Sequence, residues 1–241
     1  MGRVKIARKS TFIDMTAMSD VTVLLLTFFM LTSTFLSKEP ATVITPPSVS
    51  TEKVQETNVV QVLVNPEGKV WLTMKNDTSA NWGNDKMRMA LLDKVSEIYN
   101  ETHKNKPVSF TPEQKLTFSK LGSFGVPLAK MGEFLNLINE PEGQTKMDKW
   151  LEGDGDPNHP TGIPINWNQD DTRPNEFQMW MKAMRQSDND NLTSAIKDGT
   201  GVAIKADQNT SFEVVHLVMD NLQTIHMNKF TLLTALKGQE E

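Results

Sequence analysis

Residues 15–36 form one long, almost uncharged apolar segment, and this segment constrains the chain more than any other feature. Its sequence, MTAMSDVTVLLLTFFMLTSTFL, contains a single charged residue, Asp20. A helix rises about 1.5 Å per residue, so a helix of this length roughly matches a hydrocarbon core of about 30 Å. The sequence therefore predicts one N-terminal transmembrane helix, which we place at residues 13–37.

Asp20 is an unusual residue for such a helix. On insertion scales an aspartate near the helix centre costs about 2.5–3.5 kcal/mol, so a segment that served only as an anchor would be expected to carry an apolar residue there. At about 100° per residue, Thr16, Thr27 and Thr34 fall within roughly 40° of Asp20 and form a polar stripe. Two interpretations remain open: the carboxyl is functional, or it is hydrogen-bond glue between helices.

The charge distribution predicts how the chain is oriented. The net charge is −5 overall, yet the first 37 residues carry four basic groups against two acidic ones. Basic residues favour the cytoplasmic side of a membrane, so residues 1–12 are predicted to be a cytoplasmic tail and the acidic remainder to lie on the other side of that membrane. No basic domain is available to neutralise phosphates, which argues against a nucleic-acid partner.

A cleavable signal peptide is the main alternative for the same N-terminal residues. Its apolar region normally spans about 7–15 residues and ends in a cleavage site of small residues. Here the apolar region is longer and contains Asp20, and it is followed by Leu36-Ser37-Lys38-Glu39-Pro40. We therefore favour a retained anchor. The absence of cysteine excludes a disulfide framework and does not identify a compartment.

Residues 38–57 are predicted to be a linker, because Pro40, Pro46 and Pro47 block a helix. Within it, residues 41–44 are β-prone. Val43 and Ile44 belong to this β-prone piece, and a solvated tether is the alternative.

Residues 58–241 are predicted to form one α+β domain. Residues 58–64 and 70–74 read as a β-hairpin, and the 3.6-residue apolar spacing of 84–101 as a helix packed on it. Helices are predicted again at 175–184 and 211–226, and strands at 201–206 and 229–236. Parallel strands joined by a helix would then give a small α/β layer.

Residues 103–175, between these blocks, are predicted to be an insertion of short helices and loops. Helices are expected at 111–121, with Thr111 as N-cap, and at 130–138, whereas residues 140–173 read as loop. Because no candidate conducting residue lies in it, we expect the insertion to tune partner choice and to be removable without loss of the fold. Its tryptophans, Trp150 and Trp167, are predicted to be core residues.

No enzymatic, metal or cofactor site is predicted. Asp154, Asp156 and Asn158 have the spacing of half a calcium loop, but His159 and Ile165 replace the turn glycine and the terminal glutamate. The four histidines lack zinc-site spacing, and no nucleophile or phosphate-binding motif is present. Asp207 and Asp220 are interpreted as turn or cap residues.

The run Ile13 to Met30, IDMTAMSDVTVLLLTFFM, resembles the membrane segment of the ExbD/TolR family, whose pattern is I-N-V-T-P-F-I-D-V-x-x-V-L-L-I-I-F-M. Asp20 falls on the essential aspartate of that pattern. Ala17 stands where the family usually has proline, and Ser19 replaces an apolar residue. A second resemblance lies near the C-terminus, in Ile204-Lys205-Ala206-Asp207, Val218-Met219-Asp220-Asn221-Leu222 and Phe230-Thr231-Leu232-Leu233-Thr234.

The resemblance implies a proton-driven motor subunit rather than an enzyme. It implies that Asp20 carries protons, with Thr16, Thr27 and Thr34 facing the pore. The implied partners are an ExbB/TolQ-like multi-span channel subunit, a second copy of the chain, and a TonB-like or TolA-like periplasmic protein, to which Val43 and Ile44 would couple. The motor would energise outer-membrane transport or, in a TolR-like role, envelope maintenance. The alternative from another class is an anchored periplasmic binding or scaffold module.

Overall fold

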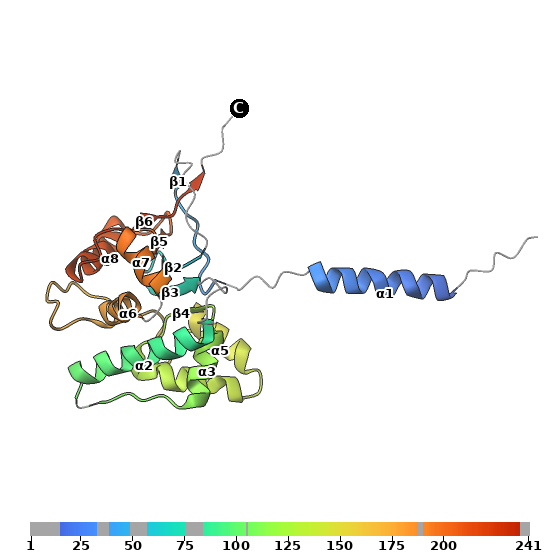
Figure 1. Cartoon of the computed structure of the whole chain (residues 1–241), viewed down its shortest axis with the longest axis horizontal. Coiled ribbons are helices and arrows are strands. Elements are labelled where there is room, and N and C mark those ends of the chain that lie inside the picture. The colour runs from blue at the N-terminus through green and yellow to red at the C-terminus, as the bar shows by residue number, and fades with distance from the viewer. Residues whose placement is uncertain are drawn as a thin grey trace, which may run out of the picture. The chain divides into compact units, whose positions relative to one another are not determined.

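The computed structural model describes residues 15–32, 39–48, 57–75, 84–104, 106–187 and 190–236. The chain divides into two compact units, Met1–Lys38 and Glu39–Glu241. The first contains helix α1 (Met15–Thr32), and the second contains all the other described elements (Figure 1).

Helix α1 occupies most of the predicted transmembrane segment. Its sequence has neither glycine nor proline, so no residue interrupts the backbone hydrogen-bond ladder. The predicted segment at 13–37 extends beyond α1 at both ends, into residues outside those described. Among the described residues, none of the helices combines the length and the apolar character that crossing a membrane requires.

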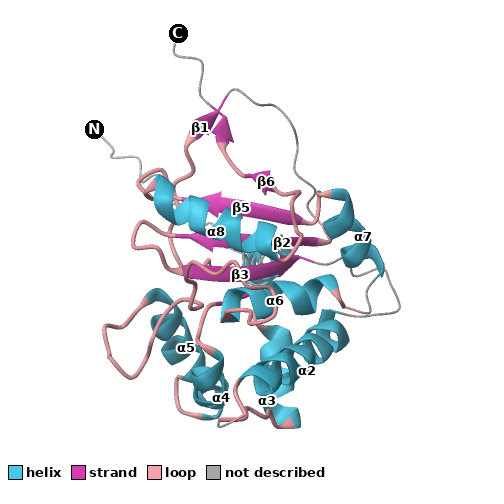
Figure 2. Ribbon diagram, turned by 90° about the vertical axis from the view of Figure 1, so that its left-hand side faces the viewer, coloured by secondary structure: helices cyan, strands magenta, loops and turns pink. Residues whose placement is uncertain are grey.

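A five-stranded mixed sheet organises the second unit, in the order β4-β3-β2-β5-β6 (Figure 2). The predicted hairpin is confirmed: β2 (Val59–Val64) pairs antiparallel with β3 (Val70–Lys75). Strand β5 (Val202–Ala206) lies parallel to β2 on the other side, as the alternation of strand and helix predicts. Two short edge strands complete the sheet, β4 (Ser123–Phe124) against β3 and β6 (Thr231–Leu232) against β5.

The predicted last strand, residues 229–236, is divided into two pieces. After β6, residues 235–236 form β7 (Ala235–Leu236), which pairs in parallel with β1 (Pro47–Ser48) in a separate two-stranded sheet. The C-terminal strand region therefore joins two different partners. The alternating pattern alone could not indicate this, because strand partners are chosen by the tertiary fold.

Helices cover the sheet face formed by Val60, Val62, Leu72 and Ile204. Helices α6 (Glu176–Arg185) and α8 (Phe212–Thr224) lie in front of the strands, and α2 (Asn84–Thr102) packs beside α6 (Figure 2). The predictions of all three helices are confirmed. Helix α7 (Asp190–Asp198), which precedes β5, was not predicted.

The insertion is more helical than the sequence indicates. Helix α3 (Pro112–Lys120) has the predicted Thr111 N-cap, completed by Gln114 in a capping box. It is followed by α4 (Leu128–Asn136), a 3₁₀ turn (Leu137–Asn139) and α5 (Gly143–Glu152). The prediction of loop at 140–173 is therefore wrong for α5, where Met147, Trp150 and Leu151 form a buried stripe.

The insertion shares one core with the rest of the unit, which contradicts the expectation that it can be removed. Phe118 and Phe124 pack with Trp180 of α6, with ring centroids 4.6–5.7 Å apart. On the opposite sheet face, the indole of Trp71 donates to the carbonyl of Leu151 at 3.1 Å. Deleting the insertion would expose both sides of the sheet, so it is part of the folding unit.

A buried arginine joins helix α2 to the sheet and to the insertion. The guanidinium of Arg88 donates to the carbonyl of Met74 at 2.8 Å and to that of Ser119 at 3.3 Å, and it also donates to the carbonyl of Leu121. Burial lowers the pKa of Arg88, partly offset by the negative charge of Asp85. The carbonyls of Ser119 and Leu121 lie at the C-terminal end of α3, where the helix dipole favours a cation.

Glu176 supplies a cap to a helix other than its own. Its carboxylate accepts a hydrogen bond of 2.8 Å from the backbone N–H of Leu128, the first residue of α4. The N-cap residue of α4 is Pro127, which makes no side-chain cap. Burial raises the pKa of Glu176, whereas the bond from Leu128 and the nearby His103 act in the opposite direction. The insertion is thereby tied to α6.

We predict opposite effects for the same substitution at two glycines. A Cβ atom at Gly125 would lie 2.2 Å from Cδ1 of the buried Trp71, whose indole is fixed by its hydrogen bond, so Gly125→Ala should destabilise the fold by at least about 1–3 kcal/mol. In α4, a Cβ atom at Gly132 meets its nearest neighbour at 3.6 Å, so Gly132→Ala should stabilise it by about 0.5–1 kcal/mol. Denaturant unfolding of both variants provides the comparison. A neutral Gly125→Ala would contradict the packing described for Trp71.

A second prediction concerns pH. Because the pKa of Glu176 is raised above 4.5 in the folded state, the folded state holds this proton more tightly than the unfolded chain. Its contribution to stability is present at low pH and is lost as the pH rises through the folded-state pKa. The free energy of unfolding of the native chain, compared with that of Glu176→Gln, should therefore decrease as the pH rises above 4.5 and through the folded-state pKa. Parallel stability curves for the two proteins would refute this.

Candidate functional site

Asp20 lies on the surface of helix α1, one and a half turns from its first residue. The neighbouring hydroxyls bond to the helix itself: Ser19 donates to the carbonyl of Met15 at 3.0 Å and Thr22 to that of Met18 at 2.5 Å. A hydroxyl bonded in this way satisfies its donor and keeps an acceptor lone pair. The carboxyl of Asp20 is therefore the one ionisable group of a helix whose described side chains are otherwise apolar or hydroxylated.

The structure places Thr27 and Asp20 on the same helix. They are seven residues apart, which is nearly two turns, so they share one face. The hydroxyl of Thr27 donates to the carbonyl of Leu24 at 2.9 Å. Thr16 belongs to α1, but its side chain lies outside the described residues, and so does the whole of Thr34. Sequence reasoning did not single out Thr22, which adds a hydroxyl on the opposite side.

Exposed apolar side chains surround this polar face. From Val21 to Leu31, every large hydrophobic residue of α1 is at least 49% exposed within the first unit. Such a surface is far larger than a soluble helix leaves uncovered, and it needs lipid or protein to cover it. The residues concerned are Val21, Val23, Leu24, Leu25, Leu26, Phe28, Phe29, Met30 and Leu31.

Val43 and Ile44 lie in the N-terminal segment of the second unit, which contacts the rest of that unit. Val43 is half-buried and packs against the core, whereas the side chain of Ile44 is 57% exposed. The backbone of Ile44 makes two hydrogen bonds: its N–H donates to the carboxylate of Asp207 at 2.8 Å, and its carbonyl accepts from the N–H of Gln208 at 2.7 Å. Asp207 also accepts from the N–H of Asn209, which confirms its interpretation as a turn residue.

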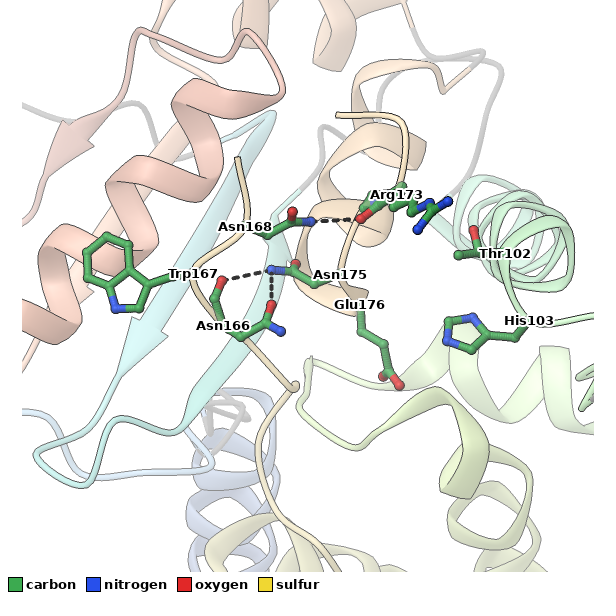
Figure 3. Close-up of a pocket in the computed structure, with 9 residues that line it drawn as sticks. Thr102, His103, Asn166, Trp167, Asn168, Arg173, Asn175 and Glu176 are labelled. Atoms are coloured by element: carbon green, nitrogen blue, oxygen red, sulfur yellow. Dashed lines mark hydrogen bonds between the residues drawn. The ribbon is translucent and has the colours of Figure 1, made fainter. Parts of the chain in front are cut away.

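A cleft of about 410 Å³ opens between the insertion and helices α2 and α6 (Figure 3). Sequence reasoning did not predict it. Its walls combine amides, a guanidinium, an imidazole and a carboxylate, and no spacing in the sequence brings these groups together. The lining residues are Thr102, His103, Asn166, Trp167, Asn168, Arg173, Pro174, Asn175 and Glu176.

The amides of the cleft mainly hold its own wall. Asn175 donates to both the carbonyl and the side-chain oxygen of Asn166, and Asn168 donates to the carbonyl of Arg173 (Figure 3). Asn221 of α8 continues this network, accepting from Asn175 at 2.6 Å. These side chains therefore fix the loop before α6 against α8, which is a structural task.

The titratable groups that line the cleft are His103, directly after α2, Arg173, in the loop before α6, and Glu176, the first residue of α6. His103 stacks on Tyr99 with ring centroids 4.2 Å apart. Burial raises the pKa of Tyr99, and the negative charge of Glu176 adds to the rise. No proton path or nucleophile joins these groups in the described residues. The cleft is a polar recess with the composition of a binding surface.

The two tryptophans of the insertion differ in burial. Trp150 is 2% exposed, as predicted for a core residue. Trp167 is 51% exposed and contacts His216 of α8, which also lies near the exposed Phe212, so the prediction that it is a core residue is wrong. The loop that carries Trp167 is held by its amide network and leaves the indole outside the core.

The loop with half of a calcium motif forms local turns. Asp154 and Asp156 accept backbone N–H groups two residues ahead, and His159 bonds to Asp154 at 2.6 Å while stacking on Trp150. The bond from His159 is the main cause of the lowered pKa of Asp154. Across the described residues, no group of three or more potential ligands is placed to hold a metal ion.

Comparison with known proteins gives one match. Residues 7–123 match the family model of the biopolymer transport protein ExbD/TolR. The match includes Asp20, continues past residue 103 into the insertion, and ends at β4, so the C-terminal block at 201–236 lies outside it. No curated protein and no solved structure matches the chain. Residues 7–123 of this chain are therefore an ExbD/TolR family domain, and the resemblance predicted from the Asp20 segment is confirmed.

Proposed function

We propose that the chain is the proton-driven motor subunit of an inner-membrane complex of the ExbB/ExbD kind. In this proposal residues 13–37 cross the membrane once, the basic tail is cytoplasmic and residues 39–241 lie in the periplasm. The observation that supports it most is the position of Asp20: an ionisable side chain in an ExbD/TolR domain, on a helix whose apolar side chains are exposed along its length.

Asp20 is the proposed proton carrier. An apolar environment disfavours an ionised carboxylate, so a carboxyl there takes up a proton when it faces lipid or protein and releases it in a polar channel. One charge crossing 100 mV is worth about 2.3 kcal/mol, which is comparable to the insertion cost of an aspartate of about 2.5–3.5 kcal/mol. A single proton is therefore enough to change the preferred environment of the helix. Thr16, Thr27 and Thr34 would line the polar face.

The proposed partners follow from the exposed apolar surface of α1 and from the family. An ExbB/TolQ-like multi-span subunit would provide the channel in which Asp20 works, with two copies of this chain sharing it. Two negative charges close together in one channel repel each other, which favours one charged and one neutral copy. Such asymmetry lets the copies alternate. The periplasmic unit would pass the work to a TonB-like protein for outer-membrane transport, or to a TolA-like protein for envelope maintenance.

Val43 and Ile44 are the proposed coupling residues. Ile44 is the better placed of the two, because its side chain is 57% exposed while Val43 packs against the core. An extended backbone with an exposed branched side chain suits strand pairing with a partner.

One observation favours the alternative of an anchored binding or scaffold module. The cleft of about 410 Å³ and the exposed Trp167 lie in the insertion, away from the coupling residues. In that case Asp20 would only hold helices together. The two functions differ in their need for the proton gradient.

The first functional prediction is that Asp20→Asn abolishes work without preventing assembly. Asparagine has nearly the same shape but stays neutral, so the variant should co-purify with the channel subunit and show no uncoupler-sensitive transport. Asp20→Glu keeps the ionisable group one methylene further out and should retain partial activity at most. Asp14→Asn, the same change at the neighbouring acidic residue, serves as control and should remain active. Full activity of Asp20→Asn would rule out the proton-carrier role and support the scaffold interpretation.

The second functional prediction is that Ile44→Ser weakens coupling while the fold stays intact. Exposed positions usually change stability by less than about 0.5 kcal/mol, so the thermal unfolding of this variant should match that of the native chain. Transport should fall several-fold. Thr42→Ser, at an exposed neighbour, is the matched control. Normal transport by Ile44→Ser would contradict a coupling role for this side chain.

A further inference from the structure

Residues 39–48, here called the strap, lie folded against the rest of the second unit, although they belong to the segment predicted as a linker. In Figure 1 the strap runs on the side of the sheet opposite α6 and α8. Its first residue, Glu39, makes an ion pair of 2.5 Å with Lys205 of β5. Its middle is held by the two backbone bonds of Ile44, and its last residues form β1 with the C-terminal β7.

The strap is only partly buried: Pro40 is its one buried residue, and the others are half-buried or exposed. Between residues 41 and 44 the burial alternates as in a strand, with Ala41 and Val43 half-buried against the core and Thr42 and Ile44 exposed. Three of its ten residues are prolines, which have no N–H to donate, so the backbone can form few bonds to the unit. The strap is therefore attached by a small number of contacts that can be lost one after another, as expected for a segment that opens locally.

Docking of the strap controls how far the second unit can lie from α1. Between Thr32, the end of α1, and Glu39 there are seven Cα steps, which span at most about 25 Å. If the strap were released up to its last residue, Ser48, the same connection would contain 16 steps and could span about 58 Å. Release of the strap thus more than doubles the reach of the tether.

We propose that the strap is a releasable clamp on the tether, docked at rest and detached during the work cycle. This inference rests on the proposed function, because the proton-driven movement of α1 supplies the pull. Glu39 is the first docked residue after α1, so tension from α1 acts first on its ion pair with Lys205. It then acts on the backbone bonds of Ile44 to Asp207 and Gln208. Detachment uncovers apolar surface around Ala41 and Val43, which returns the strap to its docked position when tension ceases.

The test uses a disulfide between the strap and the unit in the full-length chain with its channel partner. The chain has no cysteine, so an introduced pair is unambiguous. Ser48 and Leu236 are directly paired residues of β1 and β7, and neighbouring strands lie about 4.8 Å apart, within disulfide range. The control pair is Thr73→Cys with Ser123→Cys, at paired positions of β3 and β4 whose hydroxyls are 2.7 Å apart.

The rate of thiol oxidation is measured in energised cells and after addition of a proton uncoupler. For Ser48→Cys with Leu236→Cys we expect rapid bridging after uncoupling and several-fold slower bridging in energised cells. The control pair should bridge equally in both. Introducing Asp20→Asn should remove the difference and keep bridging rapid.

Each other outcome is equally clear. No bridging of the strap pair, while the control pair bridges, would show that the strap is not docked and overturn the inference. Equal rapid bridging in energised and uncoupled cells, in a chain whose transport is uncoupler-sensitive, would show that the strap is a permanent part of the fold and also overturn it. Slower bridging in energised cells that persists with Asp20→Asn would support release of the strap and count against Asp20 as the proton carrier. The failure of the inference and that of the proposed function are thereby distinguished.

Discussion

The second unit depends on the burial of strand β2 on both faces. All six of its residues, VVQVLV, are buried, and neither face of a strand with this composition tolerates water. A hairpin with one helix layer would cover only one side. The insertion is therefore a structural necessity: α6 packs with the insertion's aromatic rings on one face, and Trp71 meets the end of α5 on the other.

Covering both faces buries polar groups that must then find partners. Arg88 reaches three backbone carbonyls, Glu176 caps α4, and the amides of Asn175 and Asn221 bond to each other and to the loop carrying Trp167. Each contact joins elements that are far apart in the sequence. Because an unpaired buried polar group costs more free energy than a formed hydrogen bond gains, these contacts fix where the insertion sits as firmly as the apolar core does.

Our proposal assigns the energy input and the output to different units. Asp20 would respond to the proton gradient within α1, and the second unit would contact the periplasmic client. Tension in the chain would connect the two, and release of the strap would change the length of this connection. The strap is held by a short two-stranded sheet, an ion pair, the two backbone bonds of Ile44 and a few half-buried side chains.

The sequence by itself determined the local elements and the chemistry of the candidate site. Alternation and helical spacing located the β2–β3 hairpin and helices α2, α6 and α8, and a single charge in an apolar run identified Asp20 and, with it, the family. These signals are local, since they depend on residues a few positions apart. Only the tertiary structure decided the rest. It brought the strap beside Asp207 and divided the last strand between two partners. It also decided that α5 is helical and that a cleft forms around Arg173. All of these depend on contacts between residues distant in the chain, and no local period records such contacts.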